Sequence, residues 1–345
     1  MKPLSPKTLE KMYAGLGISA DTADLLHRYW LCFSNLYGVI SVRDAWAVFR
    51  NYEGTGLLHK KDFLAFSGIV QREPGHPYAV IELKEAYAGE TSEDPADRLI
   101  VNGRLIGSGY GKYALLYATE EKQAGKPYWL PERKEDFLAN TEDRFFLSRE
   151  GKEMVRFLSG LRTDGRYRNH EGKPEGALLD LDGRPVAGKR LPEFALYTRS
   201  EQFDIGYYKS GTKKESLRRE YAKTALEKVL DRIFIDLQTG GLLPDRSPGM
   251  SMQILLDLLC WDLCVTLTEA QLKRLIGLYA ELNNRSRLWL NRGWRPDEMG
   301  RGRRPGPPER LSAGPGLKKL MEQDPGARAE FERRLAELGI ALEED

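Results

Sequence analysis

The stretch NLYGVISVRDAWAVFRNY, residues 35–52, decides the fold prediction, because it leads from one helix through a short strand into a second helix. Residues 22–36 carry apolar side chains at helical spacing, and YGVIS at 37–41 is a short β-like run. Ser41 is placed to cap a helix over 44–52, since a serine side chain accepts hydrogen bonds from the first free amides of a helix. The stretch therefore predicts helix, strand and helix in that order.

The residues that follow extend this order. Two glycines end the second helix, and residues 59–71 predict a third one with apolar side chains along a single buried face. PYAVIEL at 77–83 has the composition of a strand, which we expect to pair with EAYAG at 85–89 in a hairpin. Helix, strand, two helices and a hairpin form the order of a winged helix.

Residues 160–176 are polar and rich in turn-forming residues. Asp182-Gly183, between two short apolar runs, then predicts a hairpin. The rest of the sequence is mainly helical. Apolar periodicity predicts helices over 215–237, 251–264 and 267–284. We therefore expect an α+β, helix-rich protein with an N-terminal winged-helix-like domain and a mainly α-helical C-terminal domain. The predicted boundaries are 1–160 for the winged-helix-like domain with its extension, 177–299 for the hairpin plus helical domain, and 300–345 for a Pro/Gly/Arg linker and terminal helix.

Composition limits the possible partners and the compartment. The 53 basic and 51 acidic residues of the 345-residue chain give a formal charge of +2, so any basic binding surface must be local. The N-terminal residues lack the apolar core of a signal peptide. The most apolar run, residues 250–265, contains Asp257 and Asp262 and is too short to span a bilayer. We expect a cytoplasmic protein without a membrane partner.

No motif predicts a metal or a cofactor. NYEGTGLLHKKD at 51–62 resembles a calcium loop, but it offers too few charged oxygens and ends on Asp62 instead of glutamate. Cys32, Cys260 and Cys264 lack the spacing and the histidine partners of a zinc site. We therefore expect neither a bound metal ion nor a cofactor.

The sequence indicates no reaction class either. LIGSGYGKY at 105–113 is glycine-rich but does not match a phosphate-binding loop. None of the four histidines has a neighbouring nucleophile pattern. A non-enzymatic role is favoured, and a hydrolase with an unrecognised site is the weakest alternative.

Two regions carry the residue types that bind nucleic acid. The third helix of the winged-helix-like segment offers cations for phosphate contacts. Residues 285–310 contain eight arginines against three acids, next to tryptophan and asparagine, and such groups form phosphate forks and stack on bases. The candidate contacts with nucleic acid or a protein partner are Lys60, Lys61, Arg72, Arg285, Arg287, Arg292, Trp294, Arg303 and Arg304.

A structural interpretation of ELNNRSRLWLNRGWRPDEM, residues 281–299, competes with the binding interpretation. Gly293 suits a left-handed helix stop, and Pro296 suits the first turn of a new short helix. Trp289, one turn past an amphipathic helix, is then expected to be buried against it. This alternative explains the glycine, the proline and the tryptophans, but not the arginines.

Three stretches of the chain resemble a group of uncharacterised proteins of Gram-positive bacteria. NNRSRLWLNRGWRPDEM is similar to their NNTR-x-W-x-N-x-G-x-TP-x-E segment, NLYGVI to their NLYG-x-I segment, and GKPYWLPERKEDFL to their GKPYY-x-P-x-x-x-x-FL segment. Many members carry a C-terminal SEC-C zinc motif, and the resemblance implies association with nucleic acid or the translation machinery. No cysteine follows Cys264 here, so the SEC-C motif is absent and zinc is not implied.

We therefore expect a cytoplasmic binding protein that contacts nucleic acid or a nucleoprotein. The principal alternative is a protein–protein adaptor that uses the winged-helix-like domain for docking, since such domains also serve that purpose and a fold alone does not fix a function.

Overall fold

The computed structural model describes residues 4–107, 111–168, 174–208, 210–240, 248–302, 309–312 and 340–343. The chain forms two compact units, residues 1–296 and 297–345. Its elements are mainly helices with a few short, mostly antiparallel strand pairs, so the prediction of a helix-rich α+β protein is confirmed. The candidate residues with described side chains lie in the first unit, and the arginines at 303 and 304 lie outside the described residues.

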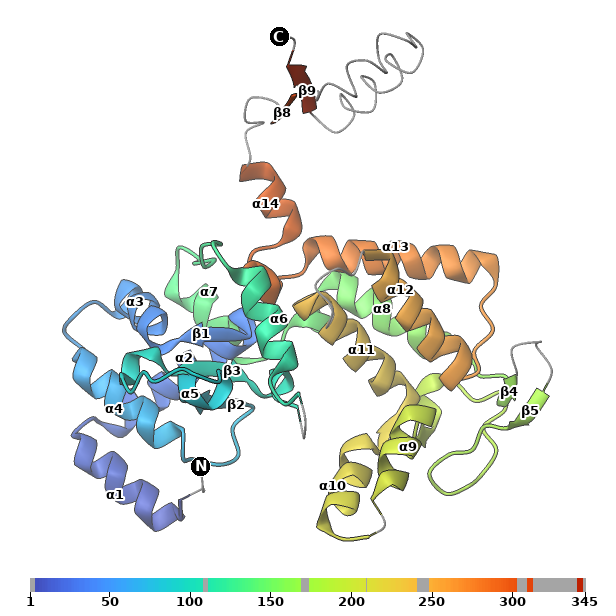
Figure 1. Ribbon diagram of the computed structural model, residues 1–345, viewed down its shortest axis with the longest axis horizontal. Helices are drawn as coiled ribbons and strands as arrows, with labels where there is room; N and C mark the ends of the chain where they lie inside the picture. Colours follow the sequence, from blue (N-terminus) through green and yellow to red (C-terminus); the bar gives the residue numbers. More distant parts are fainter. Residues whose placement is uncertain are drawn as a thin grey trace. The chain divides into compact units, whose positions relative to one another are not determined.

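Residues 20–81 of the larger unit follow the order expected from the sequence, which is helix, strand, two helices and strand (Figure 1). Ser41 caps the third helix by accepting a 3.0 Å hydrogen bond from the amide of Asp44, as predicted. The elements are α1 (Pro6–Leu16), α2 (Ala20–Tyr37), β1 (Val39–Ser41), α3 (Val42–Glu53), α4 (Lys60–Val70), β2 (Tyr78–Ile81), α5 (Leu83–Ala86), η1 (Pro95–Asp97), β3 (Leu99–Asn102), η2 (Gly103–Leu105), α6 (Ala114–Gln123), α7 (Lys134–Leu138), η3 (Ala139–Thr141) and η4 (Phe145–Leu147).

The strands β1, β3 and β2 form an antiparallel sheet with β3 in the middle. The predicted hairpin between residues 77–83 and 85–89 is therefore wrong, because β2 pairs with β3 and Leu83–Ala86 is a short helix. Leu99–Asn102 is the better partner because all four of its residues are buried, as a central strand requires. A short apolar run of this kind carries no alternation that marks it as a strand in the sequence.

The second half consists mainly of helices around α11 and α13 (Figure 1). The predicted single helix over 215–237 is wrong: it is broken at 222–224, where Thr224 and Glu227 form a capping box that starts a new helix. The elements are α8 (Arg149–Gly160), β4 (Arg166–Arg168), β5 (Pro174–Ala177), η5 (Leu191–Glu193), β6 (Ala195–Leu196), α9 (Arg199–Tyr207), α10 (Thr212–Tyr221), β7 (Lys223–Thr224), α11 (Ala225–Thr239), α12 (Pro248–Asp257), a π-helical turn (Leu258–Asp262), α13 (Glu269–Arg285) and η7 (Trp289–Asn291). α14 (Pro296–Gly302) begins at the last residue of this unit, and the smaller unit contains β8 (Glu309–Ser312) and β9 (Ile340–Glu343).

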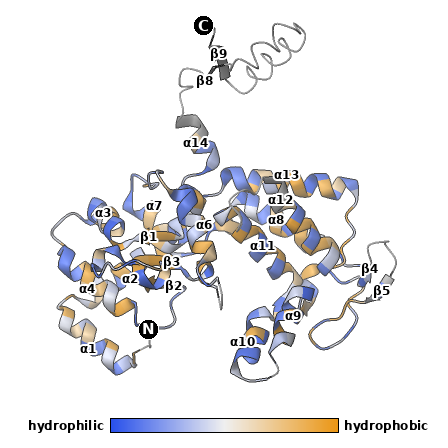
Figure 2. Cartoon of the chain, in the orientation of Figure 1, coloured by the Kyte–Doolittle hydropathy of each residue, from blue (hydrophilic) through white to orange (hydrophobic). Residues whose placement is uncertain are grey.

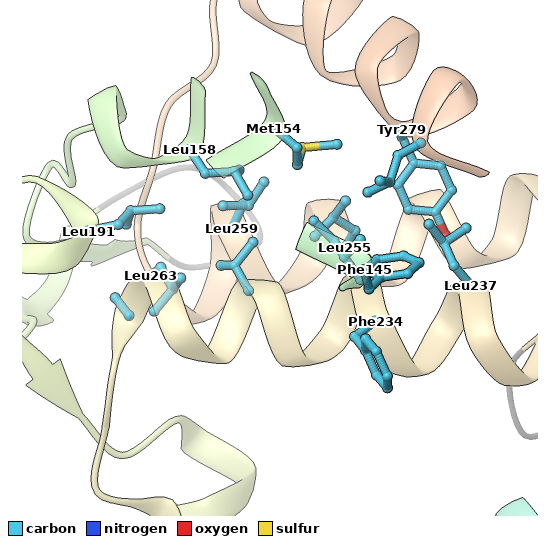
Figure 3. Close-up of a cluster of buried hydrophobic side chains, with 14 of the residues drawn as sticks. Phe145, Met154, Leu158, Leu191, Phe234, Leu237, Leu255, Leu259, Leu263 and Tyr279 are labelled. Atoms are coloured by element: carbon cyan, nitrogen blue, oxygen red, sulfur yellow. The ribbon is translucent and has the colours of Figure 1, made fainter. Parts of the chain in front are cut away.

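The two faces of the sheet contribute to different hydrophobic clusters among the described residues. Successive side chains of a strand point to opposite faces, so Ile40 and Ile100 join an aromatic cluster around α2, whereas Val39 and Val101 join a cluster with the C-terminal helices. Figure 3 shows the centre of the second cluster, where α8, α11, α12 and α13 contribute Met154, Leu237, Leu255 and Tyr279, among others.

The second cluster contains residues from both predicted domains, and the boundary at 160–176 stays a prediction. Hydrophobic and hydrophilic residues alternate along surface helices such as α4 and α13, as one-sided burial requires (Figure 2). Among the residues that the structure describes, none of the helices combines the length and the apolar character needed to cross a bilayer.

Candidate functional site

Three segments that are far apart in the sequence meet in the structure. They are residues 35–38 at the end of α2, residues 123–129 after α6, and residues 287–294, and we call them the three-segment joint. The amide of Trp129 donates a 2.9 Å hydrogen bond to the carbonyl of Arg292, and Lys126 Nζ donates to the carbonyl of Leu290 at 2.8 Å.

Trp289 lies at the centre of this joint. Its side chain is fully buried, its Nε1 donates a 2.9 Å hydrogen bond to the carbonyl of Asn35, and its ring meets Phe234 edge to face. Gly38 lies against it so closely that a Cβ there would be 2.6 Å from Trp289 Cδ2. The expectation that Trp289 is buried is confirmed.

A buried glutamine joins all three segments. Gln123 Nε2 donates to the carbonyls of Tyr37 and Trp289, each at 2.7 Å. Buried polar groups need hydrogen-bond partners, and these two bonds tie the backbones of the segments together. The Trp289 carbonyl also accepts from the amide of Arg292 at 2.8 Å.

The predicted stop and restart of helices around residues 281–299 is confirmed. Thr268 and Gln271 form the expected capping box at the start of α13, which ends at Arg285. Gly293 has a φ of +82°, the left-handed conformation that glycine adopts most easily, and α14 begins at Pro296.

Arg287 and Arg292 make contacts within this joint. The Arg287 guanidinium lies 3.2 Å from the ring centroid of Trp129 and donates to the carbonyl of Gly293 at 2.9 Å. Arg292 lies over the ring of Tyr128 and donates to the carbonyl of Lys126 at 2.7 Å. Cation–π contacts of this kind contribute about 0.5–2 kcal/mol each, so the two arginines help to hold the joint together.

The joint concentrates positive charge in a partly buried place. Burial lowers the pKa of the Lys126 ammonium, and the nearby Arg292 and Lys122 cations lower it further. The carbonyl of Leu290 and Asn291 Oδ1, each within 2.9 Å of Lys126 Nζ, offset this cost. Glu120 and Glu121 interact electrostatically with Arg292 and Lys122, so part of this positive charge is balanced nearby.

The remaining predicted site residues are spread over the chain. Trp294 is half-buried and donates from Nε1 to the carbonyl of Pro127, so it also contacts the joint. Arg285 forms an ion pair with Glu150 at 3.1 Å, yet its side chain is 60% exposed. Lys60 and Lys61 are exposed at the start of α4, Arg72 is half-buried beyond its end, and Arg303 and Arg304 lie outside the described residues.

A polar cavity of about 380 Å³ lies beside the three-segment joint. Its arginines come from two distant parts of the chain: Arg144 from the segment before α8, and Arg285, Arg287 and Arg295 from the end of α13 and the residues after it. Trp129 lines the same cavity. The structure thus brings Arg285 and Arg287 together with Arg144, which carried no signal in the sequence.

Of the acids that line this cavity, Asp136 and Asp143 are paired with other arginines, whereas Glu142 is exposed. Arg133 forms a fork of two hydrogen bonds, at 2.9 and 2.7 Å, with the carboxylate of Asp136, and this contact lowers the pKa of that carboxyl. Asp143 is paired with Arg104 at 3.0 Å. In the described part of the chain the Arg144 guanidinium makes no ion pair, so it is available to an anionic ligand.

A second polar cavity, of about 440 Å³, lies between α9, α11 and α12 and was not predicted. Burial lowers the pKa of Lys228, whose Nζ donates to both carboxylate oxygens of Glu201 and to the carbonyl of Tyr221. Burial also raises the pKa of Asp262 in the same cavity. Lys228 and Glu201 pair with each other, and they also hydrogen-bond to the backbone at the end of α10 and at the start of α9. We therefore interpret this network as structural.

Comparison of the chain with protein-family models, with curated proteins and with solved structures finds no match in any of the three. The functional interpretation therefore depends on the residues and contacts described above.

Proposed function

We propose that this protein is a non-enzymatic binding protein that contacts nucleic acid or a nucleoprotein at the cavity lined by Arg144 and Arg285. The observation that carries the proposal is the convergence of arginines from two distant segments on one polar cavity whose aspartates are already paired. Guanidinium groups form two parallel hydrogen bonds with a phosphate, and Trp129 offers an aromatic surface nearby.

The order of the N-terminal elements supports a winged-helix-like domain in this proposal. α2, β1, α3, α4, β2 and β3 follow one another along the chain, and the strands pair in the order β1-β3-β2. However, α1 packs along α4, with the ring of Tyr13 5.8 Å from that of Phe66. Because α1 covers part of α4, we assign the main contact with nucleic acid to the arginine-lined cavity. Lys60 and Lys61, at the exposed start of α4, then make only a minor electrostatic contribution to binding.

Replacing Arg144 and Arg285 together by glutamine should weaken binding about equally across nucleic-acid sequences. Each lost phosphate contact should reduce the slope of log affinity against log salt by about 0.7 for single strands and about 0.9 for duplex DNA. The measurement is filter binding of single-stranded RNA, structured RNA and duplex DNA over a series of salt concentrations.

The matched control is Arg184→Gln together with Arg218→Gln, two partly exposed arginines that do not line this cavity. This control should keep the parent slope, and both double variants should melt close to the parent, since surface changes of this kind alter stability by about 0.5 kcal/mol. An unchanged slope of log affinity against log salt in the Arg144/Arg285 variant would show that nucleic acid does not bind at this cavity.

The second candidate function is a protein–protein adaptor, and one observation favours it. Phe203 and Tyr207, one helical turn apart on α9, are 75% and 77% exposed. Exposed aromatic pairs are enriched where proteins meet. An adaptor predicts no appreciable affinity for any nucleic acid at physiological salt, and loss of a protein partner when Phe203 and Tyr207 are replaced by serine.

A further inference from the structure

A cluster of metal-binding side chains lies where α1, α2 and the segment between α4 and β2 meet. It consists of Tyr13 on α1, His27 on α2, Glu73 and His76 in the connecting segment, and Tyr78 at the start of β2. One ligand atom from each of His27, Glu73 and His76 lies within 4.8 Å of the others. The proposed nucleic-acid site does not use any of these residues.

The local structure holds the two imidazoles face to face. Gly75, with a φ of +96°, turns the chain between Glu73 and His76, so that both side chains point back toward α2. The rings of His27 and His76 stack with centroids 4.8 Å apart, and the rings of His76 and Tyr78 stack with centroids 4.9 Å apart. Packing therefore brings the side chains of the cluster together.

The separations of the ligand atoms fit a small divalent ion. Glu73 Oε2 lies 3.7 Å from His27 Nε2 and 3.4 Å from His76 Nε2. A tetrahedral zinc ion with bonds of roughly 2.0–2.1 Å places its ligand atoms about 3.4 Å apart. The Tyr13 hydroxyl is 3.2 Å from His27 Nε2 and donates a hydrogen bond to the same Glu73 oxygen, so it orients this carboxylate toward the histidines.

The hydrogen bonds around the cluster orient it for such a role. His27 Nδ1 is 2.9 Å from the Tyr78 hydroxyl, and an Nδ1–H that donates there leaves Nε2 with its lone pair facing Glu73. Metal-bound histidines are held by a second partner in this way. The buried Nε2 of His76 has no hydrogen-bond partner among the described residues, although such buried nitrogens are usually satisfied.

We propose that His27, Glu73 and His76 bind one zinc ion, with water at the fourth position and the Tyr13 hydroxyl orienting the Glu73 carboxylate. The ion would fasten α2 to the segment that follows α4, and Tyr13 would tie α1 to the same site. This proposal reverses the expectation of no bound metal, because His27 lies far from Glu73 and His76 in the sequence. The only local signal was the spacing of Glu73 and His76 by three residues.

The test is a titration of the full chain, after dialysis against a chelator, with zinc chloride in competition with a chromophoric chelator. The parent should bind one equivalent, and its melting temperature should rise with the zinc concentration because only the folded state holds the complete site. His76→Ala and Glu73→Gln should each lower the affinity at least about 100-fold, and Tyr78→Phe about 10- to 100-fold.

The matched control is His59→Ala, an exposed histidine at the start of α4 that should leave zinc affinity unchanged. Substitution with cobalt(II) gives a second readout, since the visible spectrum of a tetrahedral site should be present in the parent and lost in Glu73→Gln. No zinc uptake by the parent, or equal affinity in the parent, His76→Ala and Glu73→Gln, would overturn the proposal.

Discussion

Replacement of Trp289 by alanine should lower the free energy of unfolding by about 3–5 kcal/mol, the usual cost of truncating a buried tryptophan. The side chain is fully buried against Phe234 and also donates a hydrogen bond to Asn35. Its removal therefore leaves a cavity and an unpaired carbonyl at the centre of the three-segment joint. Urea denaturation followed by circular dichroism measures the change.

Trp261→Ala is the matched control, because the Trp261 side chain is 46% exposed. The loss of stability there should be several times smaller. Equal losses in the two variants would mean that Trp289 is not the anchor of the joint, and a parent-like Trp289→Ala protein would favour an exposed, base-stacking role for this ring.

A single methyl group at Gly38 should be almost as damaging. Gly38 has a φ of +69°, where a side chain costs about 1–2 kcal/mol, and the new Cβ would lie 2.6 Å from Trp289 Cδ2. Overpacking of a filled core costs about 1–3 kcal/mol more. We expect Gly38→Ala to lower the free energy of unfolding by about 2–5 kcal/mol in the same denaturation experiment.

Gly15→Ala in α1 is the control for this substitution, since nothing lies within 4 Å of a Cβ there and alanine is the better helix former. It should leave stability unchanged or raise it by up to about 1 kcal/mol. The double variant Gly38→Ala/Trp289→Ala should be less unstable than the sum of the two single changes, because the clash disappears with the indole ring. Strict additivity would contradict the contact.

The sequence was informative where structure depends on near neighbours. The caps at Ser41 and Thr268 and the left-handed Gly293 follow from side chains that act within a few residues. The pairing of β2 with β3 could not be predicted in this way, because it joins strands separated by a long connection. The break at 222–224 was hidden by apolar residues that continue at helical spacing across it.

The candidate site depends even more on distant contacts. The sequence singled out Arg285, Arg287 and Arg292 by their density, but could not distinguish contacts within the joint from contacts with a ligand. Arg144 has no distinguishing neighbours and became a candidate only because the fold brings it beside Arg285. For the same reason His27 was not linked to Glu73 and His76.

The most direct test of the proposed binding site is ultraviolet cross-linking of the full chain to single-stranded RNA, followed by identification of the cross-linked peptides by mass spectrometry. Binding at the arginine-lined cavity predicts cross-links in residues 129–148 and 285–295, which decrease when Arg144 and Arg285 are replaced by glutamine. Cross-links confined to α4 or α9, or a yield that the double substitution leaves unchanged, would contradict it.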